Sequence, residues 1–313
     1  MRAVGIARGG SALVTGASAG IGEAFARSLA ARGVDLMLSA LPREEGRLAA
    51  LAQELTDRHG VRCLTAAVDL SERDGPDRLR AAAEGAGFAP DLLVNNAGVM
   101  AVGAFATAPL DSWLPLVHVN IEAVVRLSRQ FVQPMIERGS GAVVIVASTA
   151  AFQPQPYFAV YAASKAFLLS LGQALWAECR GSGVHVLTVC VGPVQSRPDA
   201  GAASATGAGG FLRRRFLTPD RVAEAALAAL ARDRPVLVLR MSGAGRLYGA
   251  ASLIRSALPV RTRLRLSKRI NSWLYGTGGD GQEVSRSDTA QSSSAAAASR
   301  LSGDESTRSC PEK

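Results

Sequence analysis

Residues 11–33 read SALVTGASAGIGEAFARSLAARG, and this stretch decides the fold. The apolar run at its start is typical of a buried strand, and an amphipathic helix is predicted from about residue 20. Between them, glycines spaced G-x-x-x-G-x-G leave room for the backbone to approach a ligand. The helix N-terminus behind them offers free N–H groups and a positive dipole end. The order strand, glycine turn and helix therefore predicts a pyrophosphate site at Gly16, Gly20 and Gly22.

Two further apolar runs end in polar side chains. The segment DLLVNNAGVM predicts a strand followed by Asn95 and Asn96, and GAVVIVASTA predicts a strand that ends near Ser148. Ligands bind at the carboxyl ends of strands in open parallel sheets. We therefore expect the two amides and the Ser148 hydroxyl to face a ligand, although Asn-Gly is also common in plain turns.

The segment YAASK places Tyr161 and Lys165 four residues apart. On a helix these positions share one face, one turn apart. A neighbouring ammonium favours the phenolate, so we expect Lys165 to lower the pKa of Tyr161 towards neutrality. A phenol tuned in this way can exchange a proton with a carbonyl or an alcohol.

Together these motifs resemble the short-chain dehydrogenase/reductase family, of the ordinary single-domain type. The matching pieces are TGASAGIG, Asp69 in AAVDLS, NNAG, Asn120 in VHVN, Ser148, YAASK and VGPVQS, and they span about residues 10–240. The resemblance implies hydride transfer between a nicotinamide dinucleotide and a carbonyl or alcohol. It implies Tyr161 as acid/base, Lys165 as its partner and ribose ligand, Ser148 orienting the substrate oxygen, and Asn120 supporting a relay water.

The residues that this resemblance predicts to hold the cofactor are Gly16, Ser18, Gly20, Ile21, Gly22, Asp69, Asn95, Asn96, Lys165, Gly192 and Ser196, with Arg43 added from its position. One departure concerns the segment VCVGPVQS, where Val191 replaces the usual proline and Ser196 the usual threonine. This departure weakens the expected contact with the cofactor amide.

The choice between NAD and NADP depends on the end of the second predicted strand. An acidic residue there favours NAD and an arginine favours NADP, but Ala40 and Leu41 stand at the expected positions. Arg43 is the nearest cation and suits a 2′-phosphate. Since no acid is expected to repel that phosphate, NADP is favoured, with NAD as the alternative.

Alternating patterns predict an α/β fold: a doubly wound, Rossmann-type, mostly parallel sheet with helices on both faces. Strands are expected at 11–15, 34–39, 62–67, 91–95, 142–147, 184–190 and 235–239. Helices are expected at 20–32, 43–59, 72–86, 108–137, 157–180 and 219–232. Residues 1–240 form the expected catalytic domain, 241–275 a basic amphipathic appendage, and 276–313 a disordered tail that lacks aromatic residues.

Other features limit the function. The four cysteines form no C-x-x-C pair and the three histidines are scattered, so no metal site or disulfide framework is predicted. With no signal peptide or transmembrane run evident, a cytoplasmic location is expected. The net charge of +9 lies largely in residues 255–269. We expect no nucleic-acid binding, because no groove-reading motif is present.

The predicted function is an NAD(P)-dependent oxidoreductase that acts on an apolar ketone, acyl or steroid-like substrate and forms a homo-oligomer. Residues 197–218 are expected to form a substrate lid with Phe211, Leu212, Phe216 and Leu217. Two alternatives remain: a dinucleotide-binding regulatory protein, and a lipid-binding protein that contacts a membrane through residues 255–275. A solvated helix is the plain alternative for that last segment.

Overall fold

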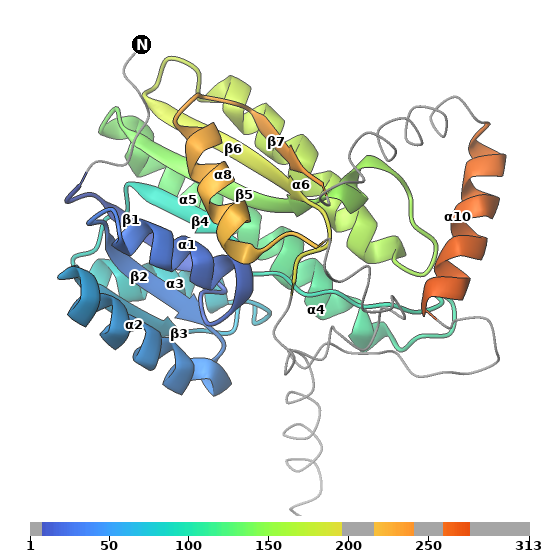
Figure 1. Ribbon diagram of the computed structural model, residues 1–313, viewed down its shortest axis with the longest axis horizontal. Helices are drawn as coiled ribbons and strands as arrows, with labels where there is room; N and C mark the ends of the chain where they lie inside the picture. Colours follow the sequence, from blue (N-terminus) through green and yellow to red (C-terminus); the bar gives the residue numbers. More distant parts are fainter. Residues whose placement is uncertain (1–7, 196–215, 241–258, 276–313) are drawn as a thin grey trace, which may run out of the picture.

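The computed structural model describes residues 8–195, 216–240 and 259–275. Its centre is a seven-stranded sheet in the order β3-β2-β1-β4-β5-β6-β7, in which every neighbouring pair is parallel (Figure 1). The strands are β1 (Ser11–Thr15), β2 (Asp35–Ala40), β3 (Cys63–Ala67), β4 (Leu92–Asn95), β5 (Gly141–Ser148), β6 (Val184–Val191) and β7 (Val236–Leu239). The predicted doubly wound α/β fold is confirmed.

Helices cover both faces of the sheet because its strands are apolar on both sides. On one face Phe25 and Val222 belong to the same buried cluster as Val144; on the other, Phe131 and Leu168 pack with Ile145. The first face carries α1 (Gly20–Ala30), α2 (Glu45–His59) and α8 (Pro219–Leu230). The second carries α3 (Gly75–Gly85), α5 (Ala123–Glu137) and α6 (Ala159–Glu178).

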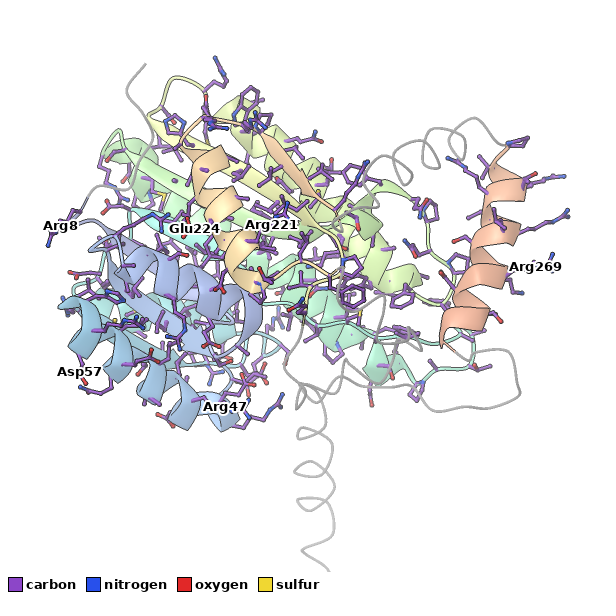
Figure 2. The ribbon with its side chains drawn as sticks, viewed as in Figure 1. Arg8, Arg47, Asp57, Arg221, Glu224 and Arg269 are labelled. Atoms are coloured by element: carbon purple, nitrogen blue, oxygen red, sulfur yellow. The ribbon has the colours of Figure 1, made fainter. Side chains whose placement is uncertain are left out.

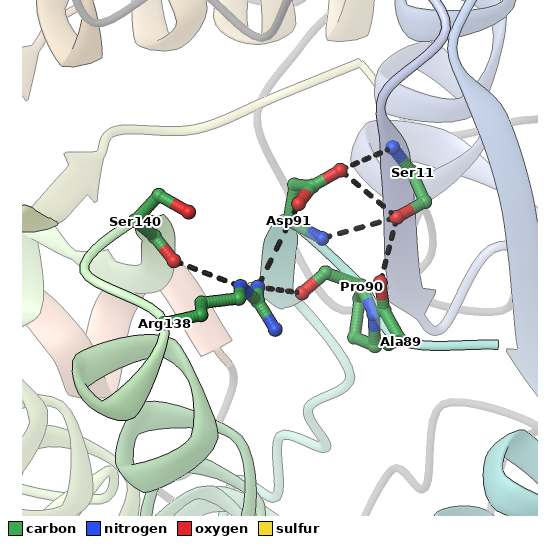
Figure 3. A network of polar contacts seen from close by, with 6 residues as sticks. All are labelled: Ser11, Ala89, Pro90, Asp91, Arg138 and Ser140. Atoms are coloured by element: carbon green, nitrogen blue, oxygen red, sulfur yellow. Dashed lines mark hydrogen bonds and ion pairs between the residues drawn. The ribbon is translucent and has the colours of Figure 1, made fainter.

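The strand order reverses between β1 and β4, and this reversal opens a crevice at their carboxyl ends. The amino ends are tied by the polar network in Figure 3. There Asp91 accepts hydrogen bonds from the Ser11 backbone N–H at 2.9 Å and the Ser11 hydroxyl at 3.1 Å. Arg138 donates to the carbonyls of Pro90 and Ser140. Polar contacts therefore occupy the amino ends of these strands, and a ligand is expected at their carboxyl ends.

The prediction of a single helix over 108–137 is wrong for the first half of this range. The structure has a 3₁₀ turn, η2 (Leu110–Ser112), then the short helix α4 (Leu114–Val117), a π-helical turn, η3 (His118–Glu122), and finally α5. Asn120 in the π turn is fully buried and bonded to the backbone of Val99. A local widening of this kind re-aims one side chain, and it often occurs at functional sites.

The appendage contains a helix, α10 (Val260–Tyr275). Its Asn271 donates a hydrogen bond to the Pro156 carbonyl, in the loop that follows the 3₁₀ turn η4 (Thr149–Phe152). In Figure 1 α10 stands at the opposite end of the molecule from α2 and β3. The predicted tail at 276–313 and most of the predicted lid lie outside the described residues. Within that lid segment Leu217 is 1% exposed and packs in the core beside α8, so its prediction as a lid residue is wrong.

Candidate active site and dinucleotide crevice

The glycine turn after β1 has the backbone that its sequence predicted. Gly16 and Gly20 have φ values of +64° and +60°, which L side chains rarely adopt. A Cβ at Gly22 would overlap the carbonyl oxygen of Gly16, whereas a Cβ at Gly20 would meet no atom within 4 Å. Gly22 therefore lets the turn pack onto α1, and Gly20 faces open space.

The start of α1 has no side-chain cap. Ala19 is the N-cap residue, and it makes no side-chain hydrogen bond to the first turn. Helices leave their first N–H groups without intrahelical partners. The turn therefore offers N–H donors and the positive end of α1 at the surface over Gly20, which is the chemistry that a pyrophosphate needs.

Asn96 holds this turn from β4. Its amide donates to the carbonyls of Thr15 at 2.9 Å and Gly16 at 3.1 Å, and its backbone N–H donates to the Thr15 hydroxyl at 3.0 Å. Both amide hydrogens of Asn96 are thus used inside the protein. Asn96 therefore holds the glycine turn in place through these bonds.

Asn95, which the family resemblance predicts to be a cofactor ligand, lies on the α5 side of the sheet. The residue is 3% exposed, and its side-chain amide donates a hydrogen bond to the Ser128 hydroxyl of α5 at 3.1 Å. Consecutive strand residues point to opposite faces. The apolar residue two positions earlier, Leu93, packs on the same side as α5. Asn95 therefore tethers β4 to α5.

The other predicted cofactor residues lie near the carboxyl edge of the sheet. Asp69 follows β3, and its Oδ1 accepts hydrogen bonds from the Ser71 N–H and hydroxyl at 2.8 and 2.7 Å. Ile21 is half-buried against the core beneath the glycine turn. The Gly192 N–H donates to Leu239 at 2.8 Å, which extends the pairing of β6 with β7. Ser196 lies outside the described residues.

A carboxylate that the sequence argument did not foresee reaches the glycine turn. The Ser18 hydroxyl donates to Glu44 Oε2 at 2.7 Å. Glu44 ends the short 3₁₀ turn η1 (Pro42–Glu44) after β2, next to the exposed Arg43. The expectation that no acid lies at this position is therefore wrong, since Glu44 and Arg43 both border the end of β2.

Ser148 and Tyr161 meet at the end of β5. Ser148 ends the strand, and its hydroxyl accepts a hydrogen bond from the Ala150 N–H at 3.1 Å, which caps η4. The Ser148 hydroxyl lies close enough to the Tyr161 phenol to act on its pKa. Two hydroxyls from different elements therefore converge, as the proposed chemistry on a carbonyl oxygen requires.

Lys165 lies one turn further along α6, with its ammonium over the Tyr161 ring. Its Nζ is 5.7 Å from the ring centroid and donates to the Val146 carbonyl at 3.2 Å. The residue is 5% exposed. Burial lowers the pKa of Lys165 to about 8, and Cys190 nearby acts in the opposite direction.

The pKa of Tyr161 differs from our expectation. Burial raises the pKa of this phenol, and the Ser148 hydroxyl partly offsets the increase. The sequence argument expected the Lys165 ammonium to lower it. The lysine lies over the ring and is bonded to a backbone carbonyl, so desolvation is the larger effect.

Asn120 joins this cluster from the opposite side. Its Oδ1 accepts from the Val99 N–H at 2.9 Å, and its Nδ2 donates to the Val99 carbonyl at 2.9 Å and to the Ser164 hydroxyl at 3.2 Å. Ser164 in turn donates to the Tyr161 carbonyl at 2.8 Å. Asn120 therefore ties the loop after β4 to the helix that carries Tyr161 and Lys165.

Gly98 lies close to both Asn120 and Lys165. A Cβ there would lie 3.2 Å from Asn120 Oδ1 and 3.4 Å from Lys165 Nζ. The Asn120 amide and the Lys165 ammonium therefore lie beside Gly98, where the family resemblance predicts a ribose and a relay water. Together with the open turn at Gly20, this arrangement fits a dinucleotide that spans the crevice from β1 to α6.

Sequence reasoning missed Thr15, Glu44, Gly98 and Ser164. Ser164 lies inside YAASK, so its place on the helix was readable, but its bond to Asn120 was not. Thr15 and Glu44 act through contacts with segments 26 or more positions away. No local signal in the chain marks such partners.

Within the described part of the chain no group of three histidine, cysteine or acidic side chains could hold a metal ion. The same residues include no helix that is both long and apolar enough to cross a bilayer.

The comparisons with known proteins identify the family of this chain. Residues 11–205 match the family model of the short chain dehydrogenases, which is more than half of the chain. The chain belongs to the short-chain dehydrogenase/reductase family, a family of oxidoreductases.

Individual relatives share the domain. A short chain dehydrogenase of Pseudocercospora fijiensis is 36% identical, over 62% of this chain and 62% of the relative. A very-long-chain 3-oxoacyl-CoA reductase of Anas platyrhynchos is 35% identical, over 60% of each chain. The chain thus spans under two thirds of the length of these two relatives.

A solved structure extends the similarity. The short-chain dehydrogenase of Sphingobium yanoikuyae in complex with NADPH is 29% identical and has a TM-score of 0.67, with 80% of this chain and 96% of that chain covered.

Proposed function

We propose that this protein is an NADPH-dependent reductase of an apolar ketone or acyl substrate. The observation that carries the proposal is the convergence of Ser148, Tyr161, Lys165 and Asn120 at the carboxyl end of β5, beside the glycine turn. The nicotinamide supplies the hydride when it is bound. Every other part of the catalysis belongs to the side chains of this chain.

In this proposal Ser148 and Tyr161 donate hydrogen bonds to the substrate oxygen, where negative charge develops. Burial raises the pKa of Tyr161, so the phenol holds its proton at neutral pH. A protonated acid beside a carbonyl suits reduction, in which the oxygen gains a proton. Lys165 and Asn120 would position the ribose and a relay water.

An apolar substrate is supported by the surroundings of Tyr161. Val160 and Tyr161 pack against a cluster that contains buried Trp113, and Phe158 meets the Tyr161 ring edge-on at 6.3 Å. Phe105 stacks on Trp113 and is 66% exposed. Aromatic side chains at a site entrance favour an apolar ligand. The acyl-CoA reductase activity of the avian relative agrees with an acyl or long-chain substrate.

The cofactor preference is proposed from the end of β2. Ala40 and Leu41 carry no charge, and exposed Arg43 suits a 2′-phosphate. The NADPH complex of the Sphingobium relative supports this preference. The Glu44 carboxylate acts against it, because it lies on the glycine turn and would repel a phosphate.

The test is a panel of long-chain, aromatic and steroid-like ketones and alcohols with NADPH and with NADH, followed by nicotinamide absorbance. We expect NADPH oxidation with apolar ketones. The variant Tyr161→Phe should lose turnover by at least about 10²-fold, as expected for a missing acid, and should bind NADPH as the native protein does. Native turnover in Tyr161→Phe would remove the phenol from the mechanism.

A further inference from the structure

Helix α10 packs on the protein through a narrow polar stripe. Ser267 and Asn271 are 5% and 6% exposed, and Asn271 donates to the Pro156 carbonyl at 2.9 Å and to Gln155 at 3.4 Å. A groove beside this contact is lined by Gln153, Pro154, Val260, Arg263, Leu264 and Ser267. The helix is therefore seated on the loop between Ser148 and Tyr161, at the rim of the proposed active site.

The opposite face of α10 is strongly basic. Arg261, Arg265, Lys268 and Arg269 are exposed, and at about 3.6 residues per turn they occupy one side of the helix. Residues 260–275 include no acid. Figure 2 shows Arg269 at the outer edge of the molecule, away from the sheet.

Several arginines elsewhere on the described surface form ion pairs between elements. Arg27, Arg32 and Arg126 pair with carboxylates of neighbouring elements at 2.6–2.8 Å. No ion pair among the described residues involves α10. Exposed cations gathered on one helix, with no acid in residues 260–275, produce a local positive potential.

Exposed aliphatic side chains accompany the charge. Leu266 is 42% exposed, and Leu264 and Val260, which are 36% and 56% exposed, line the groove beside the inner contact. A helix with basic residues on one arc and leucines beside them lies in the plane of a membrane interface, with its cations near anionic head groups. The helix has 16 residues, and no described helix spans a bilayer. The chemistry fits lying on a membrane and excludes crossing it through α10.

We propose that the outer face of α10 docks this protein on an anionic lipid bilayer. The charge complementarity between four exposed cations and anionic head groups selects this partner, and exposed Leu266 adds apolar contact. Because the inner face of α10 sits on the 153–156 loop, docking brings the rim of the active site to the membrane. An apolar substrate could then enter from the lipid phase.

The experiment is co-sedimentation of the full chain with two kinds of vesicle, phosphatidylcholine alone and phosphatidylcholine with about one third phosphatidylserine. We expect sedimentation only with the anionic vesicles, and release at high salt. Partitioning of the protein onto the anionic vesicles should fall at least roughly tenfold in the quadruple variant Arg261→Gln/Arg265→Gln/Lys268→Gln/Arg269→Gln. Leu266→Gln should weaken it less.

A matched control separates α10 from net charge. Arg58, Arg73, Arg232 and Arg234 are exposed elsewhere on the surface, and changing these four to Gln removes the same charge. The control should keep native partitioning, and both quadruple variants should keep native NADPH binding. Equal loss in the two variants, or no sedimentation of the native protein with anionic vesicles, overturns the proposal. Binding to an RNA or DNA duplex without vesicle binding would also overturn it.

Discussion

At the scale of single residues, Lys165 is a buried cation whose burial opposes its charge. Its ammonium is buried at 5% exposure and has one backbone acceptor, Val146, so its pKa falls to about 8. Cys190 beside it is fully buried, and burial raises the pKa of that thiol to about 11. Neither group offers a full counter-charge at neutral pH. A site that keeps such a lysine sacrifices stability for function.

The variant Lys165→Met should therefore be more stable than the native protein at pH 7 and inactive. The drop from 10.5 to about 8 corresponds to at most about 3 kcal/mol. Because the folded-state pKa lies below the unfolded one, the folded protein binds fewer protons between pH 8 and 10.5. Native stability should thus rise with pH across this window, and the advantage of the variant should shrink. Thermal melts at pH 7 and pH 9.5 measure both effects; a destabilised variant at pH 7 would contradict them.

Cofactor choice depends on the opposed charges of Arg43 and Glu44. Glu44→Gln should tighten NADPH binding severalfold and leave NADH nearly unchanged, because the neutral amide keeps a partner for Ser18 and no longer repels a phosphate. Arg43→Ala should reduce the difference in binding affinity between NADPH and NADH. Calorimetric titration of each variant with both cofactors decides. A native protein that binds NADH more tightly than NADPH would reverse the proposed preference.

At the scale of elements, the glycine turn and α1 form the anion site through backbone geometry. Gly20 combines a φ of +60° with open space above its Cα, so a side chain there would project towards the proposed pyrophosphate. Gly16 is less suited to a test, since a Cβ there would already lie 3.0 Å from Ala97 Cα and Asn96 Nδ2.

Gly20→Val should abolish detectable dinucleotide binding in a protein that still folds. Its matched control is Gly60→Val at the end of α2, where φ is +68° and a Cβ also meets nothing within 4 Å. Both changes carry similar backbone strain, of about 1–2 kcal/mol. Equal melting temperatures with loss of NADPH binding only in Gly20→Val would establish the role of the turn. Equal NADPH affinity in both variants would exclude it.

At the scale of the whole molecule, the stabilising polar network and the proposed active site lie at opposite ends of the strands. The Asp91 network clamps the amino ends of β1 and β4, whereas the glycine turn, Ser148 and Asn96 lie at the carboxyl ends. Arg138 approaches Asp91 at 3.7 Å and adds a weak ion pair. Changes at the clamped edge should therefore leave the crevice intact.

Asp91→Ala should cost about 1–2 kcal/mol, because the Ser11 N–H and hydroxyl lose their shared acceptor. NADPH affinity should not change. Asp91→Asn, which keeps one acceptor oxygen, should cost less. Urea unfolding gives the stability and titration the affinity; a cofactor affinity that falls in parallel with stability would show that the two edges are coupled.

Much of the fold and of the reactive pair was predictable from the chain itself. The apolar runs, the glycine turn and the spacing of Tyr161 and Lys165 are local patterns, and local periodicity sets strands, turns and helix faces. The family motifs added the order of the elements. The sequence by itself therefore determined the doubly wound sheet and the helix that carries both residues.

Only the tertiary structure decided how distant segments meet. Three hydrogen bonds illustrate this: Ser18 to Glu44, Asn95 to Ser128 of α5, and Asn271 of α10 to Pro156. Each joins residues that are far apart in the chain. The pKa of Tyr161 belongs to the same class, because it follows from burial that no spacing encodes. Such contacts depend on how the elements pack against one another in three dimensions, and a local pattern carries no information about that packing.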